Sequence, residues 1–179
     1  SKKELQDNLG TIARSGTKNF LSKLSGDAKK DSQLIGQFGV GFYSSFMVAD
    51  RVEVATKKAG NKESWRWVSD GESGFEIKKD IKKENGTSIT LYLNEEGKEF
   101  ASRWKIESLI KKYSDHIDFP IFLTYSDTEY DDEGKEKGSK IKTDQVNDAK
   151  AFWTRSKSEL KDKEYKEFYK SFSNDMEDP

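Results

Sequence analysis

Four short segments in which apolar and polar residues alternate constrain the fold more than any other feature of this sequence. They lie at residues 51–54, 64–67, 75–78 and 88–93. Alternation with a period of two is typical of a strand with one buried and one exposed face. Turn-forming pairs separate the segments: GN at residues 60–61, DG at 70–71 and NG at 85–86. We therefore predict an antiparallel meander with one polar and one apolar face.

Helix signals lie on both sides of these strands. Ser1 and Glu4 form a capping-box pattern at the start of a helix that should end near Gly10. Residues 42–48 predict a strongly apolar helix, buried on most sides. Residues 100–117 carry apolar side chains at helical spacing and predict an amphipathic helix that Pro120 stops, followed by a strand at 121–125.

Residues 10–31 combine small, polar and glycine residues. We expect a hinged loop over 10–17, a short helix that Thr17 caps and that carries Phe20, Leu21 and Leu24, and a polar stretch over 25–31. This composition is expected of a lid over a binding site. Taken in isolation, however, the segment is better interpreted as an ordinary surface loop.

The last third of the chain changes character. Residues 126–138 are almost entirely polar and charged, which predicts a solvated linker. Further on, four aromatic residues recur at helical spacing: Tyr165, Phe168, Tyr169 and Phe172. An aromatic helix face needs a partner surface. We therefore expect the protein to continue past Pro179, and because the first residue is Ser1, not methionine, we expect residues upstream as well.

The charge balance and the missing cysteines exclude several classes of function. The 32 basic and 33 acidic residues leave a net charge of −1, which gives no overall field to attract nucleic acid or an anionic membrane. With no cysteine and one histidine, His116, the chain has no ligands for a zinc site. No apolar run approaches membrane-spanning length. These features are compatible with a cytoplasmic protein that binds neither nucleic acid nor a membrane.

A glycine-rich turn at residues 36–42 (GQFGVGF) is the first candidate for chemistry. Such a turn before a helix suits phosphate, but a tight turn feeding a buried helix is an equally good interpretation. Two weaker signals accompany it. Thr87, after Gly86, has a hydroxyl that can hold a carboxylate or a water, and residues 8–17 offer an amide, a guanidinium and hydroxyls. Neither a Walker sequence nor the alternation of a dinucleotide fold is present.

At this point several motifs together resemble a known family. Residues 8–18 (NLGTIARSGTK) and 35–44 (IGQFGVGFYS) closely resemble the N-terminal nucleotide-binding domain of the heat-shock protein 90 chaperones. The resemblance continues through residues 48–52, 86–87 and 112–115. Residues 153–155 (WTR) and 164–169 (EYKEFY) resemble the start of the family's middle domain. The short charged stretch resembles the bacterial branch, since eukaryotic cytosolic members usually have a much longer acidic linker.

The resemblance implies an α+β fold. It is the two-layer α/β sandwich of the GHKL (Bergerat) ATPases, with helices on one face of a mixed sheet, here incomplete at its N-terminus. It also implies a division into three parts: a partial nucleotide-binding domain over 1–125, a charged linker over 126–138, and the start of a middle domain over 139–179.

The implied ligands are ATP or ADP with Mg²⁺ under a mobile lid. Asn8 would approach the sugar side, the backbone N–H groups of residues 37–42 would cradle the phosphates, and Thr87 would support, with water, the carboxylate that reads adenine. Arg14 stands where the family usually has a lysine reaching toward phosphate, which keeps the charge but changes its geometry. The implied nucleotide-binding residues are Asn8, Arg14, Ser15, Gly16, Gln37, Phe38, Gly39, Val40, Gly41, Phe42 and Thr87.

The resemblance also implies groups outside these residues. The family's acidic general base and magnesium-binding asparagine lie before this chain begins, the adenine-reading aspartate immediately before Ser1, and a completing arginine beyond Pro179. We therefore assign no catalytic and no metal-binding residue in the 179 residues. We expect that they do not turn over ATP alone.

The implied function is that of an ATP-dependent molecular chaperone in the stress response. It would be a cytoplasmic homodimer that binds unfolded client proteins, works with co-chaperones, and couples lid closure to clamping. Other ATPases of the superfamily, such as sensor kinases and topoisomerases, fit the motifs less well. A non-hydrolysing module that binds a nucleotide or a partner through its aromatic helix is the alternative from another class.

Overall fold

A computed structural model describes residues 1–11, 14–17, 20, 22, 36, 38–131, 133–149, 156–173 and 177. The chain divides into two compact units, Ser1–Glu99 and Phe100–Pro179. Most of the segment predicted as a lid, and the WTR motif at 153–155, lie outside the described residues. In the described part, no helix has the length and apolar character needed to cross a membrane.

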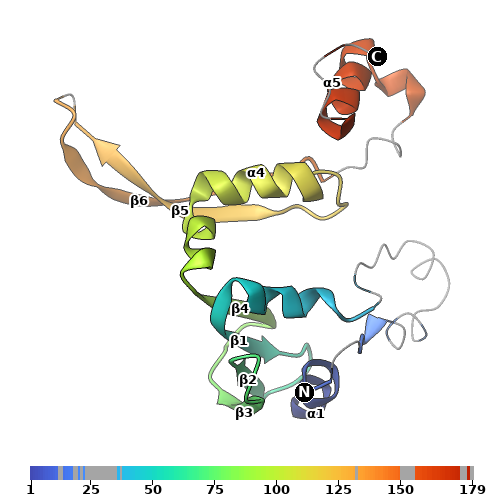
Figure 1. The fold of residues 1–179 in the computed structure, drawn as a ribbon, viewed down its shortest axis with the longest axis vertical. Coiled ribbons are helices and arrows are strands. Elements are labelled where there is room, and N and C mark those ends of the chain that lie inside the picture. The colour runs from blue at the N-terminus through green and yellow to red at the C-terminus, as the bar shows by residue number, and fades with distance from the viewer. Residues whose placement is uncertain are drawn as a thin grey trace. The chain divides into compact units, whose positions relative to one another are not determined.

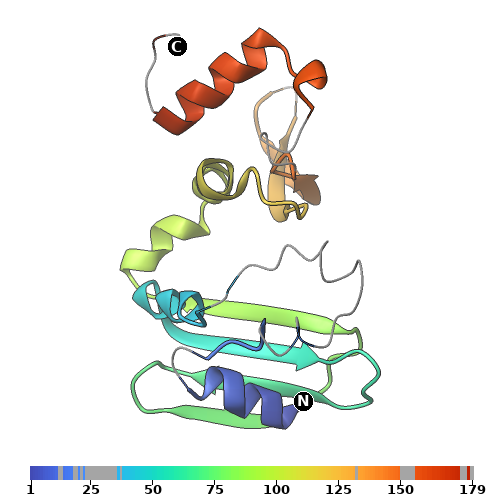
Figure 2. The ribbon, with the colours of Figure 1, turned by 90° about the vertical axis from the view of Figure 1, so that its right-hand side faces the viewer.

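The first unit is built on a four-stranded antiparallel sheet with the order β3-β2-β1-β4 (Figures 1 and 2). The strands are β1 (Ala49–Lys57), β2 (Ser64–Ser69), β3 (Phe75–Asp80) and β4 (Gly86–Leu93). The predicted strands and their antiparallel pairing are confirmed. A simple meander is wrong for the last strand, because β4 pairs with β1 and not with β3.

The route from β3 to β4 explains this difference. Residues 81–85 cross the ends of β2 and β1, a distance of about 14 Å for three strand spacings, which five extended residues can span. The ammonium of Lys57 donates to the carbonyl of Lys83 at 2.9 Å and so holds the crossing against the end of β1. The result is a Greek-key arrangement, which local turn signals do not predict.

Helices cover one face of this sheet. The α-helix α1 (Lys2–Leu9) contacts β3, and the 3₁₀-helix η1 (Gly41–Met47) contacts β1; Figure 2 shows α1 against the β2–β3 side of the sheet. The buried core consists of Leu5, Ala49, Val52, Val54 and Trp67. Trp67 is 2% exposed and meets Phe42 and Phe46 edge-on, which places this tryptophan at the centre of the core.

The opposite face is polar, as the alternation predicts. Arg66 on β2 lies between two carboxylates, 2.7 Å from Glu53 on β1 and 3.2 Å from Asp80 on β3. These ion pairs cross three neighbouring strands. Among the described elements of the first unit, the fold therefore has helices on one face of an antiparallel sheet, whereas the complete two-layer sandwich stays a prediction.

The two helices of this unit agree with the sequence to different degrees. The capping box of α1 is confirmed: Glu4 N–H donates to the Ser1 hydroxyl at 3.3 Å, and the Ser1 amino group contacts the Glu4 carboxylate at 2.7 Å. The expectation that residues 42–48 are buried on most sides is wrong, since η1 has no fully buried residue and Met47 is 74% exposed. The Ser44 and Ser45 hydroxyls each donate to a carbonyl three residues earlier at 2.6 Å, which favours a tight 3₁₀ turn.

The second unit contains α4 (Arg103–Ser114), the hairpin of β5 (Phe122–Tyr130) and β6 (Glu136–Gln145), and α5 (Asp162–Ser173). Short 3₁₀ turns also occur, η2 (Glu96–Ala101) at the junction of the units and η4 (Lys157–Glu159) before α5. The predicted amphipathic helix begins later and ends earlier than expected, at Ser114 instead of near Ile117. The amide of Asn147 donates toward the carbonyls of Ser114, Ile117 and Phe119 at 3.0–3.4 Å, and so satisfies groups that a longer helix would have paired.

The prediction of a solvated loop over residues 126–138 is wrong as local structure, because β5 runs to Tyr130 and β6 begins at Glu136. Charged residues of this segment pair across the strands while they remain in contact with solvent, as Asp127 does with Lys142. Asp131 closes the turn by accepting the N–H groups of Glu133 and Lys135. The division of the chain into domains stays a prediction.

Candidate functional site

The beginning of the predicted lid meets the glycine-rich turn that follows the lid, in the first unit. The hydroxyls of Ser15 and Thr17 lie 2.7 and 2.9 Å from the carbonyl oxygen of Gly36, and 2.9 Å from each other. They are separated from Gly36 by 21 and 19 residues in sequence. We call residues 14–17, 36 and 39 the neck.

Gly39 closes the neck on its other side. Its φ is +67°, a conformation that residues with side chains rarely adopt. A Cβ at this position would lie 2.4 Å from the carbonyl oxygen of Arg14 and 2.8 Å from its nitrogen. Gly36 also has a positive φ, of +93°. Two of the three glycines in the motif therefore meet a backbone demand that glycine alone satisfies easily, whereas Gly41 begins η1.

The neck lies beside α1, which is itself linked to η1. Asn8 lies on the last turn of α1, and its amide nitrogen would be 3.4 Å from a Cβ at Gly16. The hydroxyl of Tyr43, on η1, donates to the carbonyl of Leu9 at 3.2 Å. The structure thus brings together Asn8, Arg14, Ser15, Gly16 and Gly39 from two distant parts of the sequence.

The segment after the neck leads into η1 without a side-chain cap. Val40 is the N-cap residue of η1, and its aliphatic side chain cannot accept the hydrogen bonds that the first N–H groups of the helix offer. Phe38 and Val40 are 77% and 52% exposed, so the backbone here is accessible. Arg14, whose backbone contacts Gly39, is also exposed. Gln37 of the predicted set lies outside the described residues.

Thr87 lies on the sheet and not in the neck. It is the second residue of β4, and its hydroxyl lies 2.9 Å from that of Thr56 on β1. The register pairs Thr87 with Thr56 and Ile89 with Val54, so Thr87 lies on the face of the sheet that α1 and η1 cover. Ile89 and Leu91, on the same face, remain 54% and 38% exposed. The described helices therefore leave an apolar strip of β4 open beside the covered part of the face.

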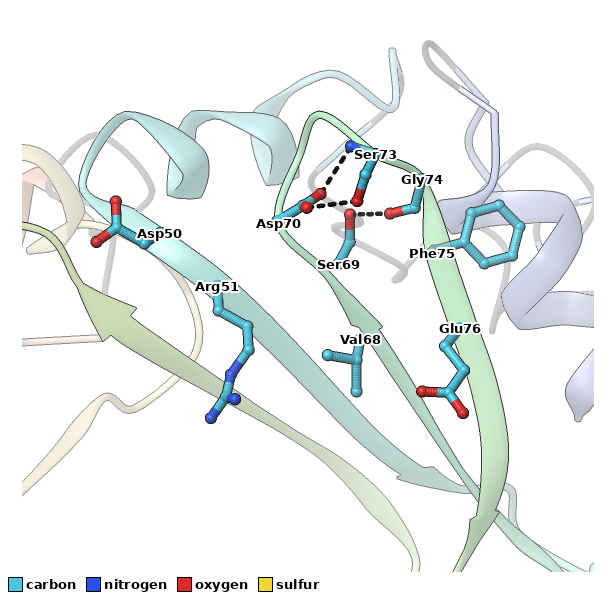
Figure 3. Close-up of a pocket in the computed structure, with 9 residues that line it drawn as sticks. All are labelled: Asp50, Arg51, Val68, Ser69, Asp70, Ser73, Gly74, Phe75 and Glu76. Atoms are coloured by element: carbon cyan, nitrogen blue, oxygen red, sulfur yellow. Dashed lines mark hydrogen bonds between the residues drawn. The ribbon is translucent and has the colours of Figure 1, made fainter.

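A hollow of about 420 Å³ lies elsewhere, where β1 begins and β2 turns into β3 (Figure 3). It is lined by Asp50, Arg51, Val68, Ser69, Asp70, Ser73, Gly74, Phe75 and Glu76, and includes no predicted site residue. The sequence did not single it out.

Two of the charged groups around this hollow are already engaged. The Asp70 carboxylate accepts the hydroxyl and N–H of Ser73 and the N–H of Glu72, which lower its pKa to about 2. Arg51 stacks on the ring of Tyr92 at 3.6 Å and lies 3.5 Å from the Glu53 carboxylate. Asp70 therefore remains ionised at neutral pH. Figure 3 shows its hydrogen bonds to Ser73, which stabilise the turn between β2 and β3. Among the described residues, no group of three or more acidic or histidine side chains is placed to hold a metal ion.

Comparison with known proteins adds independent information. Residues 126–179 match the family model described as Hsp90 protein. The chain is 59% identical over 180 residues to the chaperone protein HtpG of Helicobacter pylori (strain HPAG1), a match that covers 99% of this chain and 29% of the relative. It is also 59% identical, with the same coverage, to the chaperone protein HtpG of Helicobacter acinonychis (strain Sheeba).

A third relative, the chaperone protein HtpG of Wolinella succinogenes, is 58% identical over 176 residues, which cover 98% of this chain and 28% of the relative. The chain therefore spans somewhat less than a third of the length of these relatives. The match includes the neck and β4 as well as the second unit.

Proposed function

Because this chain belongs to the heat-shock protein 90 family, we propose that it acts within an ATP-dependent molecular chaperone, where it supplies the base of a nucleotide lid and the wall that holds the phosphates. The observation that carries this proposal is the neck. The backbones of Arg14 and Gly39 are in direct contact, and both ends of the intervening segment are hydrogen-bonded to each other through Gly36.

The neck is suited to link a ligand to the position of a lid. A lid needs a few residues that absorb its movement, and two glycines with positive φ lie where its ends meet. The same backbone runs directly into η1, which contacts β1 and packs on Trp67. A phosphate bound by the N–H groups at residues 39–42 would therefore stabilise one arrangement of the neck relative to another.

The chemistry of the nearby side chains fits a nucleotide with its magnesium ion. The guanidinium of Arg14 can hold phosphate oxygens in two hydrogen bonds, and the amide of Asn8 can contact a hydroxyl of the sugar. The open strip of β4, with Thr87, offers a surface with one hydroxyl against which a base could lie. ATP bound with Mg²⁺ would supply the hydrolysable phosphate. We propose that the residues that recognise adenine, bind the metal and activate water come from outside this chain.

At the level of the whole protein, we propose the chaperone activity that the relatives' names state, carried out by the mechanism that the family resemblance implies. Lid closure over ATP would drive a homodimeric clamp in the cytoplasm, which assists the folding and maturation of client proteins together with co-chaperones. The net charge of −1 supports protein partners over nucleic acid.

A chimera tests this proposal. In the chimera, this chain would replace the aligned segment of the Helicobacter pylori chaperone. The unaltered Helicobacter pylori chaperone is the reference. Binding of MgATP would be followed by calorimetry in the chimera and in its Arg14→Ala and Arg51→Ala variants. We expect Arg14→Ala to weaken ATP binding about tenfold to a hundredfold, since a hydrogen bond to a charged group contributes about 1.5–3 kcal/mol.

Arg51→Ala is the matched control, because Arg51 is also a partly exposed arginine of the first unit but stacks on Tyr92 away from the neck. We expect it to leave ATP binding unchanged. A folded chimera that binds no ATP, or one in which Arg14→Ala and Arg51→Ala have equal effects, would contradict the proposed role of the neck.

A further inference from the structure

The β5–β6 hairpin separates its charged residues onto one face. In an antiparallel pair, directly opposite residues point to the same side and successive residues alternate. The register therefore places Leu123, Tyr125, Asp127, Glu129, Gly138, Lys140, Lys142 and Asp144 on one side. We call this the charged face.

The charged face is engaged within its own unit. Arg103 on α4 stacks over the ring of Tyr125 at 3.7 Å and lies 3.9 Å from the Asp144 carboxylate. The Tyr125 hydroxyl donates to Asp144 at 2.6 Å, and Lys142 pairs with Asp127. The hairpin thus has one side that is held by α4 and by its own ion pairs.

The other side has almost no charge. The register assigns to this neutral face Phe122, Thr124, Ser126, Thr128, Tyr130, Ser139, Ile141, Thr143 and Gln145, with Glu136 at its turn end. It is open to solvent: Phe122, Tyr130 and Ile141 are 59%, 66% and 67% exposed. In a chain with 36% charged residues, nine uncharged side chains on one exposed surface form a distinct patch.

The residue types of the neutral face are those that pack on a strand. Threonine, isoleucine, phenylalanine and tyrosine fit a pleated surface, and the hydroxyls of Thr124 and Thr143 lie 2.9 Å apart across the pair. A charged residue placed against this face would lose water without gaining an ionic partner. The face therefore favours uncharged segments over charged ones.

The size of the face favours one kind of occupant. Strands of nine and ten residues at about 3.3 Å each give a length of about 30 Å, and two strands a width of about 10 Å, or about 300 Å². A stable dimer usually buries about 800 Å² on each partner. A stable dimer would thus need contacts beyond this face, whereas one extended strand of similar length matches the whole face.

We propose that the neutral face binds an extended, uncharged segment of a non-native polypeptide, about nine residues long. The choice of a non-native polypeptide rests on the proposed chaperone function; the choice of an extended, uncharged segment rests on the hairpin alone. Binding is weak and reversible, because the contact area is at the low end for protein interfaces. Such binding suits a partner that must be released.

The experiment uses the full 179-residue chain without nucleotide. The probe is an acetylated, amidated nine-residue peptide of alternating threonine and valine with a fluorescent label, and its binding is followed by anisotropy. We expect Ile141→Lys to weaken peptide binding about tenfold or more, because the peptide must then cover an unpaired ammonium.

The matched control is Ile81→Lys, which makes the same change at an isoleucine that is 91% exposed between β3 and β4. It should leave peptide binding unchanged. If Ile141→Lys fails to fold by near-ultraviolet circular dichroism, Ile141→Thr replaces it and should weaken binding less, while Thr124→Lys tests the opposite strand.

Three results would overturn the proposal: no peptide binding by the unaltered chain, equal effects of Ile141→Lys and Ile81→Lys, or equally tight binding of a peptide in which lysine replaces each threonine. Sedimentation of the chain alone tests the second-copy alternative; a dimer that Ile141→Lys dissociates would also overturn it. Because no nucleotide is present, each of these results leaves the proposed role of the neck untouched.

Discussion

Replacement of Gly39 by alanine is the sharpest perturbation of the neck. The added Cβ would lie 2.4 Å from the carbonyl oxygen of Arg14, and ordinary contact begins at 3.4 Å. The two backbones must therefore separate by about 1 Å, and neither can yield as the end of a flexible side chain would. Crowding of this kind costs about 1–3 kcal/mol. The φ of +67° adds about 1–2 kcal/mol for a residue with a side chain.

We thus expect Gly39→Ala to lower the free energy of unfolding of the first unit by about 2–5 kcal/mol. The neck can limit this loss by opening, in which case the hydrogen bonds of Ser15 and Thr17 to Gly36 are lost instead. Amide hydrogen exchange at residues 14–17 detects that outcome, because exchange reports local opening separately from global unfolding.

Substitutions at two further glycines separate the steric crowding from the backbone strain. Gly36 has a φ of +93° with no described atom within 4 Å of an added Cβ, so Gly36→Ala tests backbone strain alone, about 1–2 kcal/mol. Gly41 has an ordinary φ and the same open surroundings, so Gly41→Ala should change the stability by less than about 1 kcal/mol, in either direction.

Urea unfolding measures the series, with Trp104 and Trp153 replaced by phenylalanine so that fluorescence reports Trp65 and Trp67 in the first unit. The reasoning predicts that the loss decreases from Gly39→Ala through Gly36→Ala to Gly41→Ala. If Gly39→Ala matched Gly41→Ala in both stability and exchange, Arg14 and Gly39 would not be in contact.

Two other predictions concern contacts inside the units, one in each unit. The pKa of Glu4 is lowered from 4.5 to about 2, first by its hydrogen bond to Lys58 and then by the Ser1 amino group. Because the folded pKa is depressed, this carboxylate stabilises the first unit above pH 4.5 and loses that contribution as the pH falls toward 2. Lys58→Met should therefore flatten the acid limb of a stability–pH curve, and an unchanged limb would contradict the pairing. In the second unit, Asn147→Ala removes an acceptor 2.8 Å from the Ile121 N–H and the donors to the Ser114 and Phe119 carbonyls. We expect a loss of about 2–4 kcal/mol in urea unfolding and faster exchange at Ile121, whose unchanged protection would show that Asn147 does not hold it.

Local features were accessible from the sequence because they depend on neighbouring residues. The capping box at Ser1 and Glu4, and the glycine-rich turn at residues 36–42, follow from what a few consecutive residues can do. The alternation around Val52 and Trp67 likewise predicted which face of the sheet is buried. These predictions needed no knowledge of which segments meet.

Long-range pairing was the part that local patterns could not predict. Nothing near Asn85 indicates that the chain will cross two strands to pair with β1, since a turn signal fits a hairpin equally well. The charged residues around Asp127 resemble a linker until their partners on β6 are known. Once the register was given, the same alternation showed the neutral face.

The candidate site likewise had parts that the sequence could predict and parts that required the fold. The glycine motif and Arg14 could be found as residue types, but their direct contact joins positions 25 residues apart and required the fold. Thr87 could be placed on the same face of the sheet only through its pairing with Thr56. The family resemblance supplied roles for these residues, and the structure supplied their neighbours.

Amide hydrogen exchange in the chimera with the Helicobacter pylori chaperone, measured with MgATP and with adenosine at matched occupancy, asks whether the neck and the following turn hold phosphate. We predict that ATP protects the backbone amides of residues 15–17 and 39–42 and that adenosine does not, because only ATP carries the phosphates. Equal protection by both ligands, or no protection by ATP in these two segments, would contradict the account.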